Sequence, residues 1–408
     1  MSFEYGIILG GAPLNAGVVS VLRSWGLHVV VVDFRGKINL DCDTHIVHDA
    51  KSVSVVDVLI KKGISAVQMV YTSMDEAGLA QRALCKHFGL RYVEEEAIFN
   101  AHNKAGMHTK WRADGILNRE SMSFKKFDSF RIMQLNNRCP VIIKPVDSCA
   151  SRGITVLPQN VSMGELKDAF ECAQGATISK QVNVEEFVVG TEFCAEMLGD
   201  DYGNISVFGI AQKYHSATVS RNSRIAIKLL YNSLNISGKT FEAIAAYAIL
   251  CYRSVGLKNT FGHLEIIMKE DGTFSPVEIG ARSSGFIASH LVDAACDQSY
   301  LGAFRNVLHG GKTTNGLMPF GNNASMYFFY DMPSGMICRK KGSLLDYLDS
   351  RITSAYSDNH CLSPDITFKR LTQDNDRYGC EVLIGPRDVL TIEHVEKAEA
   401  VLLKEICS

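Results

Sequence analysis

Two glutamates, Glu265 and Glu278, lie on the two strands of a predicted β-hairpin in the stretch FGHLEIIMKEDGTFSPVEIGARSSG. The dipeptide Asp271-Gly272 between two apolar-rich runs predicts a two-residue type I′ turn. In that register the two glutamates are cross-strand neighbours with Cβ atoms roughly 4.5–5.5 Å apart. A divalent cation between them would remove their repulsion. Hard oxygen ligands, with no cysteine or histidine clearly on the same face, favour Mg²⁺ over zinc. The alternative is two glutamates at a solvated edge, with the register displaced by a bulge.

Arg282 follows Glu278 by four residues, in a loop bracketed by Gly280 and Gly285. Its guanidinium is always charged and presents a rigid fork of donors. Beside a metal, such a group suits a phosphate or an oxyanion that develops in a transition state. A surface ion pair is the other role open to it.

A second candidate stretch, VIIKPVDSCASRGITV, places Lys144 at the end of an apolar run and before a loop of small residues. The Walker spacing for phosphate binding is absent, so a nucleotide here would be held by another route. Further along, VNVEEFVVGTEF offers an apolar extended segment whose backbone groups can meet a purine edge. A carboxylate nearby can accept hydrogen bonds from ribose hydroxyls.

Residues 202–241 contain five Lys or Arg residues and no Asp or Glu. A solvated basic loop is one interpretation, and a grip on an anionic substrate through charge-assisted bonds is the other. Under the second interpretation, Arg221 and Arg224 are our choices for a substrate carboxylate. His215 and His263 are candidate polar members of the same site.

Elements of two kinds must position these residues. Residues 5–92 alternate strand and helix, which predicts a parallel sheet covered by helices. Later, short strands are expected at 141–144, 154–157, 177–182, 191–198 and 205–213, as in an antiparallel sheet. Ser162 and Glu165 predict a capping box at a helix start. Strands in ASMYFFY and CEVLI and a helix over 391–406 end the chain.

The composition is that of a globular protein: 408 residues, 46% hydrophobic and 21% charged. This length predicts two to four domains. The net charge of −2 argues against a general nucleic-acid binder. No basic leader and no apolar run of about 20 residues is present, so neither a signal peptide nor a membrane span is expected. The 12 cysteines form no C-x-x-C pair, as expected of reduced thiols in a cytoplasmic protein.

Taken in order, these motifs resemble those of the ATP-grasp carboxylate–amine ligases, from residue 5 to about residue 310. The family pattern has a lysine before the first small subdomain, a strand ending in I-K-P with a small-residue loop, E-E-F-x-x-G-x-E, an upstream metal acid and E-x-[NAG]-x-R. The matching residues are Lys104, Lys144, the segment 185–192, Glu265, Glu278 and Arg282.

One position departs from the commonest pattern. Many members carry Asn two residues after the second metal glutamate, whereas this chain has Gly280. The stretch EIGARSSGFI and the tail DNDRYGCEVLIGP resemble the L-amino-acid (dipeptide) ligase branch. The number of metal ions is left open by this difference.

The resemblance implies a role for each matching residue. It implies Mg²⁺, or alternatively Mn²⁺, on Glu265 and Glu278, and catalytic roles for Lys144 and Arg282. It implies ATP contacts from Lys104, Lys144, Ser148, Ser151, Gly153, Glu185, Glu186, Phe187, Val188 and Glu192. Substrate contacts are expected from Arg221, Arg224, Arg282, Ser283, Ser284 and Gly285.

The resemblance also implies a fold class of α/β and α+β type. We expect an N-terminal Rossmann-like pre-ATP-grasp domain (1–100), a small lid subdomain (101–182), a central subdomain with the Mg²⁺ site (183–315) and a small C-terminal α+β domain (316–408). The implied activity joins a carboxylate, such as an amino acid, to an amine through an acylphosphate, with release of ADP and phosphate.

The expected partners are small-molecule carboxylate and amine substrates and a second copy of the chain in a homodimer, with no nucleic acid or membrane. Two alternatives stay open. One is a ligase with a non-amino-acid donor or acceptor in polymer or secondary-metabolite biosynthesis. The other is a catalytically silent ATP-binding regulator.

Overall fold

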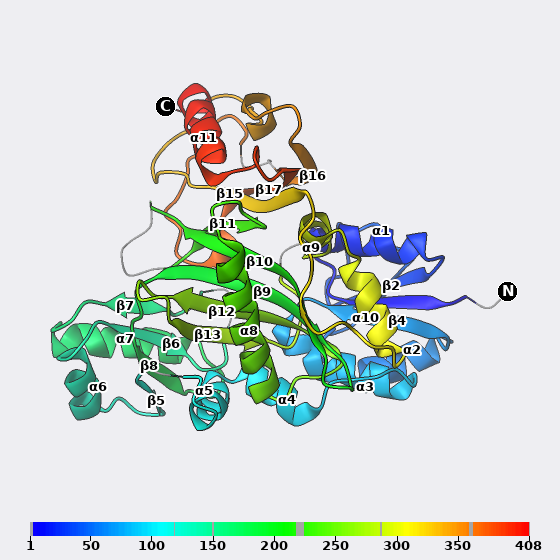
Figure 1. Ribbon diagram of the computed structural model, residues 1–408, viewed down its shortest axis with the longest axis horizontal. Helices are drawn as coiled ribbons and strands as arrows, with labels where there is room; N and C mark the ends of the chain where they lie inside the picture. The colour runs from blue at the N-terminus through cyan, green and yellow to red at the C-terminus, as the bar shows by residue number, and fades with distance from the viewer. Residues whose placement is uncertain are drawn as a thin grey trace.

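The computed structural model describes residues 3–117, 119–148, 151–217, 224–285, 288–358 and 362–407. Within these ranges the chain forms three sheets. Figure 1 shows the N-terminal sheet on the right, the largest sheet in the middle and a smaller sheet at the lower left, with the C-terminal helix above them. None of the helices in the described part of the chain combines the length and the apolarity that crossing a bilayer requires.

The N-terminal sheet is parallel, as the alternating sequence predicts. Its order is β3-β2-β1-β4, formed by β1 (Tyr5–Leu9), β2 (His28–Asp33), β3 (Thr44–Val47) and β4 (Val67–Thr72). The intervening helices are α1 (Ala16–Ser24), α2 (Val55–Lys61) and α3 (Gly78–His87). Two 3₁₀ turns, η1 (Pro13–Asn15) and η2 (Asp75–Ala77), follow the carboxyl ends of β1 and β4. The edge of the sheet from which a parallel fold presents functional groups therefore carries Asp75.

The smaller sheet, which we call the lid sheet, is antiparallel with the order β5-β8-β6-β7. It consists of β5 (Ser121–Phe124), β6 (Val141–Pro145), β7 (Thr155–Leu157) and β8 (Val182–Glu186). Along the chain, α4 (Glu95–His102) and α5 (Lys104–Ala113) precede this sheet. Helix α6 (Ser129–Asn136) connects β5 to β6, and α7 (Met163–Gly175) connects β7 to β8. The predicted capping box of Ser162 and Glu165 is confirmed at the start of α7.

The predicted strand at 177–182 was wrong, because the strand begins only at Val182. Residues 177–179 instead surround the carboxylate of Asp147, which accepts hydrogen bonds from the Thr177 hydroxyl and from the amides of Ile178 and Ser179. Lys180 has a positive φ of 57°, which does not fit an extended strand. Local side-chain hydrogen bonds therefore replace the ladder that the apolar residues suggested.

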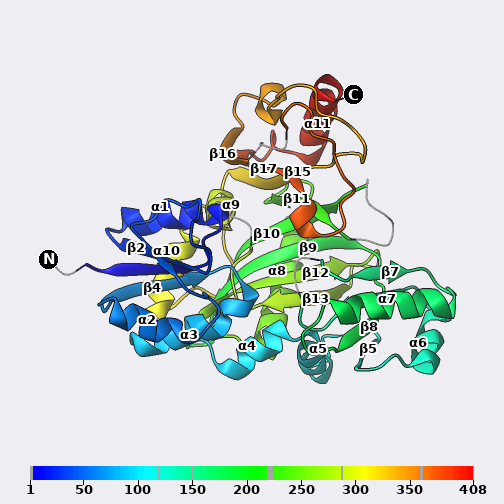
Figure 2. The same cartoon turned by 180° about the vertical axis from the view of Figure 1, so that it is seen from behind.

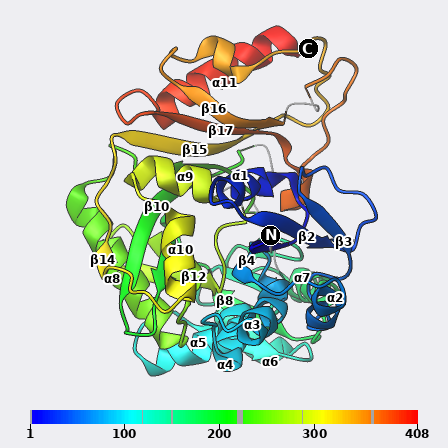
Figure 3. The ribbon, with the colours of Figure 1, turned by 90° about the vertical axis from the view of Figure 1, so that its right-hand side faces the viewer.

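The largest sheet has the strand order β13-β12-β9-β10-β11-β15-β17-β16, with β14 (Gly316–Leu317) beside β10. Its strands are β9 (Thr191–Gly199), β10 (Ile205–His215), β11 (Ala226–Tyr231), β12 (Thr260–Met268), β13 (Phe274–Gly280), β15 (Asn323–Tyr330), β16 (Thr353–Asp358) and β17 (Tyr378–Pro386). Strand β11 pairs with β15, so the sheet includes strands from both sides of residue 316, where the C-terminal domain was expected to begin. Figure 3 shows the C-terminal strands lying directly above the central ones.

The segments that connect or follow these strands contain the helices α8 (Gly238–Ser254), α9 (Ala288–Cys296), α10 (Tyr300–Leu308) and α11 (Ile392–Ile406). Two short 3₁₀ turns, η3 (Leu344–Tyr347) and η4 (Asp374–Asp376), lie in the C-terminal connections. One hydrophobic cluster joins the N-terminal sheet, α9, α10 and the largest sheet. Within it the ring centroids of Phe261 and Phe304 are 4.2 Å apart. This shared core fixes the N-terminal sheet against the strands that carry the candidate site.

The hairpin of β12 and β13 confirms the predicted pairing of Glu265 with Glu278, but by a different route. The type I′ turn was wrong: Lys269 pairs with Thr273 through a three-residue loop in which only Gly272 has a positive φ, of 77°. A bulge between Glu265 and Ile266 then restores the predicted register. The loop is one residue longer than predicted and the bulge shifts the register by one residue, so the two differences cancel.

Helix capping provides a test of the lid elements. The side chain of Asn103 accepts a hydrogen bond from the Gly106 amide at 3.0 Å and so begins α5 at Lys104. We expect Asn103→Ala and Ser162→Ala each to lower the free energy of unfolding by about 1 kcal/mol, because each removes a cap acceptor. Asn103→Asp keeps the acceptor and is the matched control. Urea denaturation measures these changes, and an Asn103→Ala protein as stable as Asn103→Asp would contradict this role.

Candidate active site

A cavity of about 1020 Å³ lies where the three sheets meet, lined by residues of the N-terminal sheet edge, the lid sheet, the hairpin and the C-terminal strands. Figure 2 shows the hairpin strands β12 and β13 beside the lid sheet, with the N-terminal sheet on the other side. Most of the residues predicted from the sequence line this cavity: Lys104, Lys144, Ser148, Ser151, Glu185, Glu186, Phe187, Val188, Glu192, Arg224, Glu265, Glu278, Arg282 and Gly285.

Several predicted residues are not brought to the cavity wall. Ser283 and Ser284 are buried behind it; the Ser283 hydroxyl is 2.7 Å from the Tyr71 hydroxyl, and the Ser284 amide donates to Glu196. Gly153 is in the predicted loop but does not line the cavity. Arg221 lies outside the described residues.

Lys104 and Glu278 form the first charged pair of the cavity. The Lys104 Nζ lies 2.9 Å from Glu278 Oε2 and also donates to the Ser148 carbonyl at 2.9 Å. Lys104 is the first residue of α5, where the helix dipole disfavours a cation. Its pairing with Glu278 offsets this cost and ties the lid loop at Ser148 to the hairpin.

Lys213 links two acids on the face of the largest sheet. Its Nζ is 2.7 Å from Glu192 Oε1 and 2.8 Å from Glu265 Oε1. Burial alone would lower the pKa of Lys213, but the two carboxylates raise it well above its usual range. Burial alone would raise the pKa of Glu192, but Lys213 and His215 lower it to about 2. Lys213 and Glu192 are therefore charged at neutral pH.

Lys144 is the last residue but one of β6 and points at Glu185, with Nζ 2.8 Å from Oε1. Arg119 donates from Nε and Nη2 to the other oxygen of Glu185, at 3.1 and 2.7 Å. Its Nη1 reaches Ser275 Oγ at 2.6 Å and also the Pro276 carbonyl on β13. Arg119 thus joins the lid sheet to the strand that carries Glu278.

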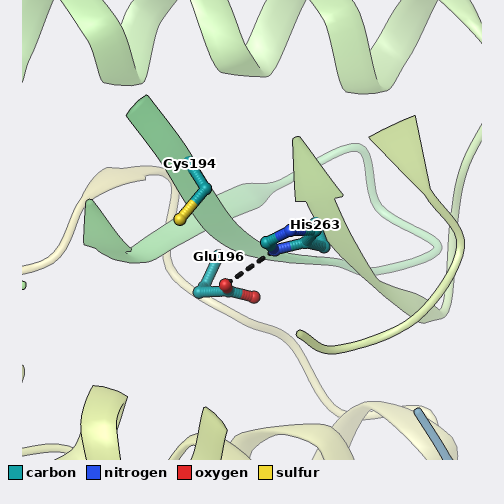
Figure 4. Close-up of side chains that lie close together, drawn as sticks. All are labelled: Cys194, Glu196 and His263. Carbon is teal, nitrogen blue, oxygen red and sulfur yellow. Dashed lines mark hydrogen bonds and ion pairs between the residues drawn. The ribbon is translucent and has the colours of Figure 1, made fainter. Parts of the chain in front are cut away.

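Cys194 and Glu196 on β9 and His263 on β12 form a buried cluster (Figure 4). His263 Nδ1 is 2.8 Å from Glu196 Oε1, and its Nε2 is 3.8 Å from Glu265. The expectation of no histidine on the glutamate face was therefore wrong, since residues two apart on a strand share a face. Burial alone would lower the pKa of His263, but Glu196 raises it to about 9, whereas burial raises the pKa of Cys194. A metal bound here would have to displace a proton from both the imidazole and the thiol.

The pair of Glu265 and Glu278 suits a hard cation better. The two residues are cross-strand neighbours and both line the cavity, so their carboxylates lie on one wall. Although burial would raise the pKa of Glu265, Lys213 lowers it well below its usual value and keeps it ionised. Oxygen donors of this kind are those that Mg²⁺ prefers.

Several cavity residues were missed by sequence reasoning: Asp75, Arg119, Tyr327, Phe329, Tyr356, Asp374 and Arg377. The last five come from the C-terminal strands and their connections. Asp374 and Arg377 lie in the tail DNDRYGCEVLIGP, which resembles the ligase branch but was not predicted to be part of a site, and no motif marks the others. Among the basic residues of 202–241, Lys228 does not belong to the site. Its Nζ is buried against Glu399 at 2.8 Å, on the C-terminal helix.

Comparisons with known proteins identify the domain and the fold that carry this cavity. Residues 137–290 match the family described as the ATP-grasp domain. In structure, the chain resembles L-amino acid ligase from Bacillus licheniformis, with a TM-score of 0.69 at 16% identity, covering 100% of this chain and 98% of that one. It also resembles the biotin carboxylase domain of Hydrogenobacter thermophilus 2-oxoglutarate carboxylase in complex with MgADP, with a TM-score of 0.67 at 15% identity, covering 95% and 86%. The chain contains an ATP-grasp domain and has the ATP-grasp fold.

Among curated proteins, the chain is 22% identical to alanine–anticapsin ligase of Bacillus subtilis over 59% of this chain and 53% of that protein. It is also 22% identical to dapdiamide A synthase of Enterobacter agglomerans over 66% of this chain and 63% of that protein. The chain therefore matches between half and two thirds of the length of these relatives.

His108 gives a pH-dependent prediction. It is buried beside Ser121 and Glu185, and burial lowers its pKa to about 3. The unfolded chain takes up this proton below a pH of about 6.5, whereas the folded protein does not. The free energy of unfolding should therefore fall by about 2 kcal/mol from this group as the pH drops from 6.5 to 5. Urea denaturation at both pH values should show a flatter dependence for His108→Gln than for wild type and for the exposed control His87→Gln. Equal slopes in all three would contradict it.

Arg119 gives a prediction on stability. Arg119→Met leaves the buried Glu185 with Lys144 as its remaining close cation, and we expect a loss of about 3–5 kcal/mol in the free energy of unfolding. Arg138→Met removes a comparable two-bond pair with Glu120 at the surface and should change stability little. Chemical denaturation compares the two variants. Similar effects of both would show that the buried position does not matter.

Proposed function

We propose that this protein is an ATP-dependent ligase that joins the carboxylate of an amino acid to an amine through an acylphosphate, with release of ADP and phosphate. The observation that supports this most is the convergence of Lys104, Lys144, Glu265, Glu278 and Arg282 on one cavity. The five residues come from three separate stretches of the chain and match the motif order of the ligases that the sequence resembles. The similarity to ligases that carry amino-acid substrates in their names supports the choice of substrate class.

The ATP end of the cavity is proposed to lie between the lid sheet and the largest sheet. Lys104 and Lys144 approach from α5 and β6 and supply positive charge for the phosphates. The segment after β8, with Phe187 and Val188 at the cavity wall, is the proposed adenine contact, and Glu192 is the proposed ribose contact. Glu265 and Glu278 would hold Mg²⁺, which neutralises phosphate charge during in-line transfer.

In the first proposed step, a carboxylate oxygen of the donor attacks the γ-phosphorus, and the bond to the β–γ bridging oxygen breaks. The products are the acylphosphate and ADP. The two lysines neutralise charge on the phosphates while the donor carboxylate approaches. The cavity walls keep water away from the acylphosphate, which would otherwise hydrolyse.

In the second proposed step, the neutral amine of the acceptor attacks the acyl carbon and gives a tetrahedral oxyanion. Collapse expels inorganic phosphate, and the nitrogen loses its extra proton as the amide forms. Arg282 lies beside Glu278 at the cavity wall and is the proposed donor to this oxyanion or to the acylphosphate. We propose the four domains in the bounds given above; the homodimer and the cytoplasmic location stay predictions.

Incubation of the protein with ATP, Mg²⁺ and a pool of amino acids tests this function. We expect ADP and phosphate in equal amounts, together with an amide-linked product that mass spectrometry identifies. Release of AMP and pyrophosphate would show adenylation and contradict the acylphosphate mechanism.

Two variants test the assigned residues in the same assay. Glu278→Ala should abolish turnover, and Lys144→Met should lower kcat/KM for ATP by on the order of 10²–10³, because each removes charge that stabilises the transition state. Glu171→Ala, on the exposed face of α7, is the control and should match wild type. Full activity of Glu278→Ala would remove the metal assignment.

A further inference from the structure

Asp75 is a carboxylate of the N-terminal sheet that reaches the candidate active site. It begins the 3₁₀ turn η2 that follows β4, and its Oδ2 lies 2.8 Å from Arg282 Nη2. Both side chains are only 14% exposed. The family match covers residues 137–290, so Asp75 lies outside the part of the chain that the match describes.

Gly280 explains how Asp75 can come so close. A Cβ atom at residue 280 would lie 2.6 Å from Asp75 Oδ1 and 3.3 Å from Arg282 Cγ. Any side chain at this position would therefore collide with the carboxylate. Many of the ligases that the sequence resembles have Asn at the position of Gly280. In this chain the carboxylate of Asp75 takes up the space that such a side chain would need.

The loop that carries Arg282 is also held by β4, the strand that precedes η2. The Tyr71 hydroxyl at the end of β4 lies 2.7 Å from Ser283 Oγ, while Arg282 Nη1 donates to the Ser283 carbonyl at 2.9 Å. The loop is thus held by β4 and the turn after it. The shared hydrophobic core fixes that strand relative to β12.

The charges at this contact are fixed at neutral pH. Burial alone would raise the pKa of Asp75, but Arg282 lowers it below its usual value. Burial alone would lower the pKa of Arg282, but Asp75 raises it above its usual range. A carboxylate on one edge of a planar guanidinium fixes the plane and direction of the donors on its other edges.

We propose that Asp75 is a positioning residue that aims the Arg282 guanidinium at the reacting acyl group, and that Gly280 is the residue that admits it. This proposal rests on the proposed ligase function. A guanidinium that is already oriented loses no rotamer freedom when the oxyanion forms, so its hydrogen bonds act at full strength in the transition state. The N-terminal sheet thereby becomes part of the catalytic site.

The test uses two variants that disturb the contact from opposite sides. Asp75→Asn keeps the size and removes the charge, and Gly280→Ala adds the Cβ that collides with Asp75. We expect each variant to lower kcat by roughly 10- to 100-fold, because small misplacements of a catalytic group have effects of this size. The KM for ATP should stay at the wild-type value, since neither residue is placed at the proposed nucleotide contacts. The double variant should lose little more than either single one.

A coupling measurement separates positioning from a merely structural role. Both variants should release more ADP than amide product, because an acylphosphate that Arg282 no longer stabilises hydrolyses before the amine attacks. Asp41→Asn, which breaks an exposed ion pair with Arg23, and Gly164→Ala, in α7, are matched controls and should keep the wild-type ratio. Thermal unfolding shows whether each variant is folded.

Several results would overturn the proposal. Folded Asp75→Asn with wild-type kcat and coupling would show that Asp75 does not position Arg282, while the ligase function would stand. A higher Mg²⁺ requirement with unchanged coupling would make Asp75 a metal ligand instead. Fully additive losses in the double variant would separate Gly280 from Asp75. A wild-type protein without ligase activity would overturn the proposed function, and this inference with it.

Discussion

The candidate site depends on pairing buried or half-buried acids with buried or half-buried cations. Glu278 lies against Lys104, Glu265 against Lys213, Glu185 against Lys144 and Asp75 against Arg282. A single buried charge without a partner would cost several kcal/mol, so each member of a pair holds the other in place. Despite burial, the cations also lower the pKa of the carboxyl groups of Glu265, Glu185 and Asp75, and ionised groups are what phosphates and cations require. Stability and chemistry therefore rest on the same contacts.

These pairs also join elements that do not otherwise share a sheet. Lys104 connects α5 to the hairpin, and Arg119 connects the lid sheet to β13 through Glu185 and the Pro276 carbonyl. Asp75 connects the N-terminal sheet to the loop after β13. The hairpin is thus held from two sides by charges on separate elements. A shift of either neighbour would change the direction of Glu278 and Arg282, which explains how a fold of three sheets can act as one site.

The hairpin itself shows how a sequence pattern can give a correct result for an incomplete reason. The Asp-Gly signal predicts a two-residue turn, and the protein forms a three-residue loop with Gly272 at positive φ. The bulge next to Glu265 compensates, because a bulge shifts the register by one residue. Arg119 hydrogen bonds to Ser275 and Pro276 in the bulged part of β13, so a contact from the lid sheet lies where the register changes.

The sequence by itself determined features that depend on near neighbours: the alternation of the N-terminal elements, the capping box at Ser162, six strands of the largest sheet (β9, β10, β12, β13, β15 and β17) and the order of the site motifs. The strands β11, β14 and β16 were not predicted. The sequence also determined that Glu265 and Glu278 would be neighbours, since pairing in a hairpin is local. Only the tertiary structure decided that Lys213 would meet Glu265, Arg119 would meet Glu185 and Asp75 would meet Arg282. It also decided that C-terminal residues such as Phe329 would line the cavity. Hydrogen-bonding patterns repeat over a few residues and can be read along the chain. The partner of a buried charge is chosen by how sheets pack, and that information is spread over the whole core.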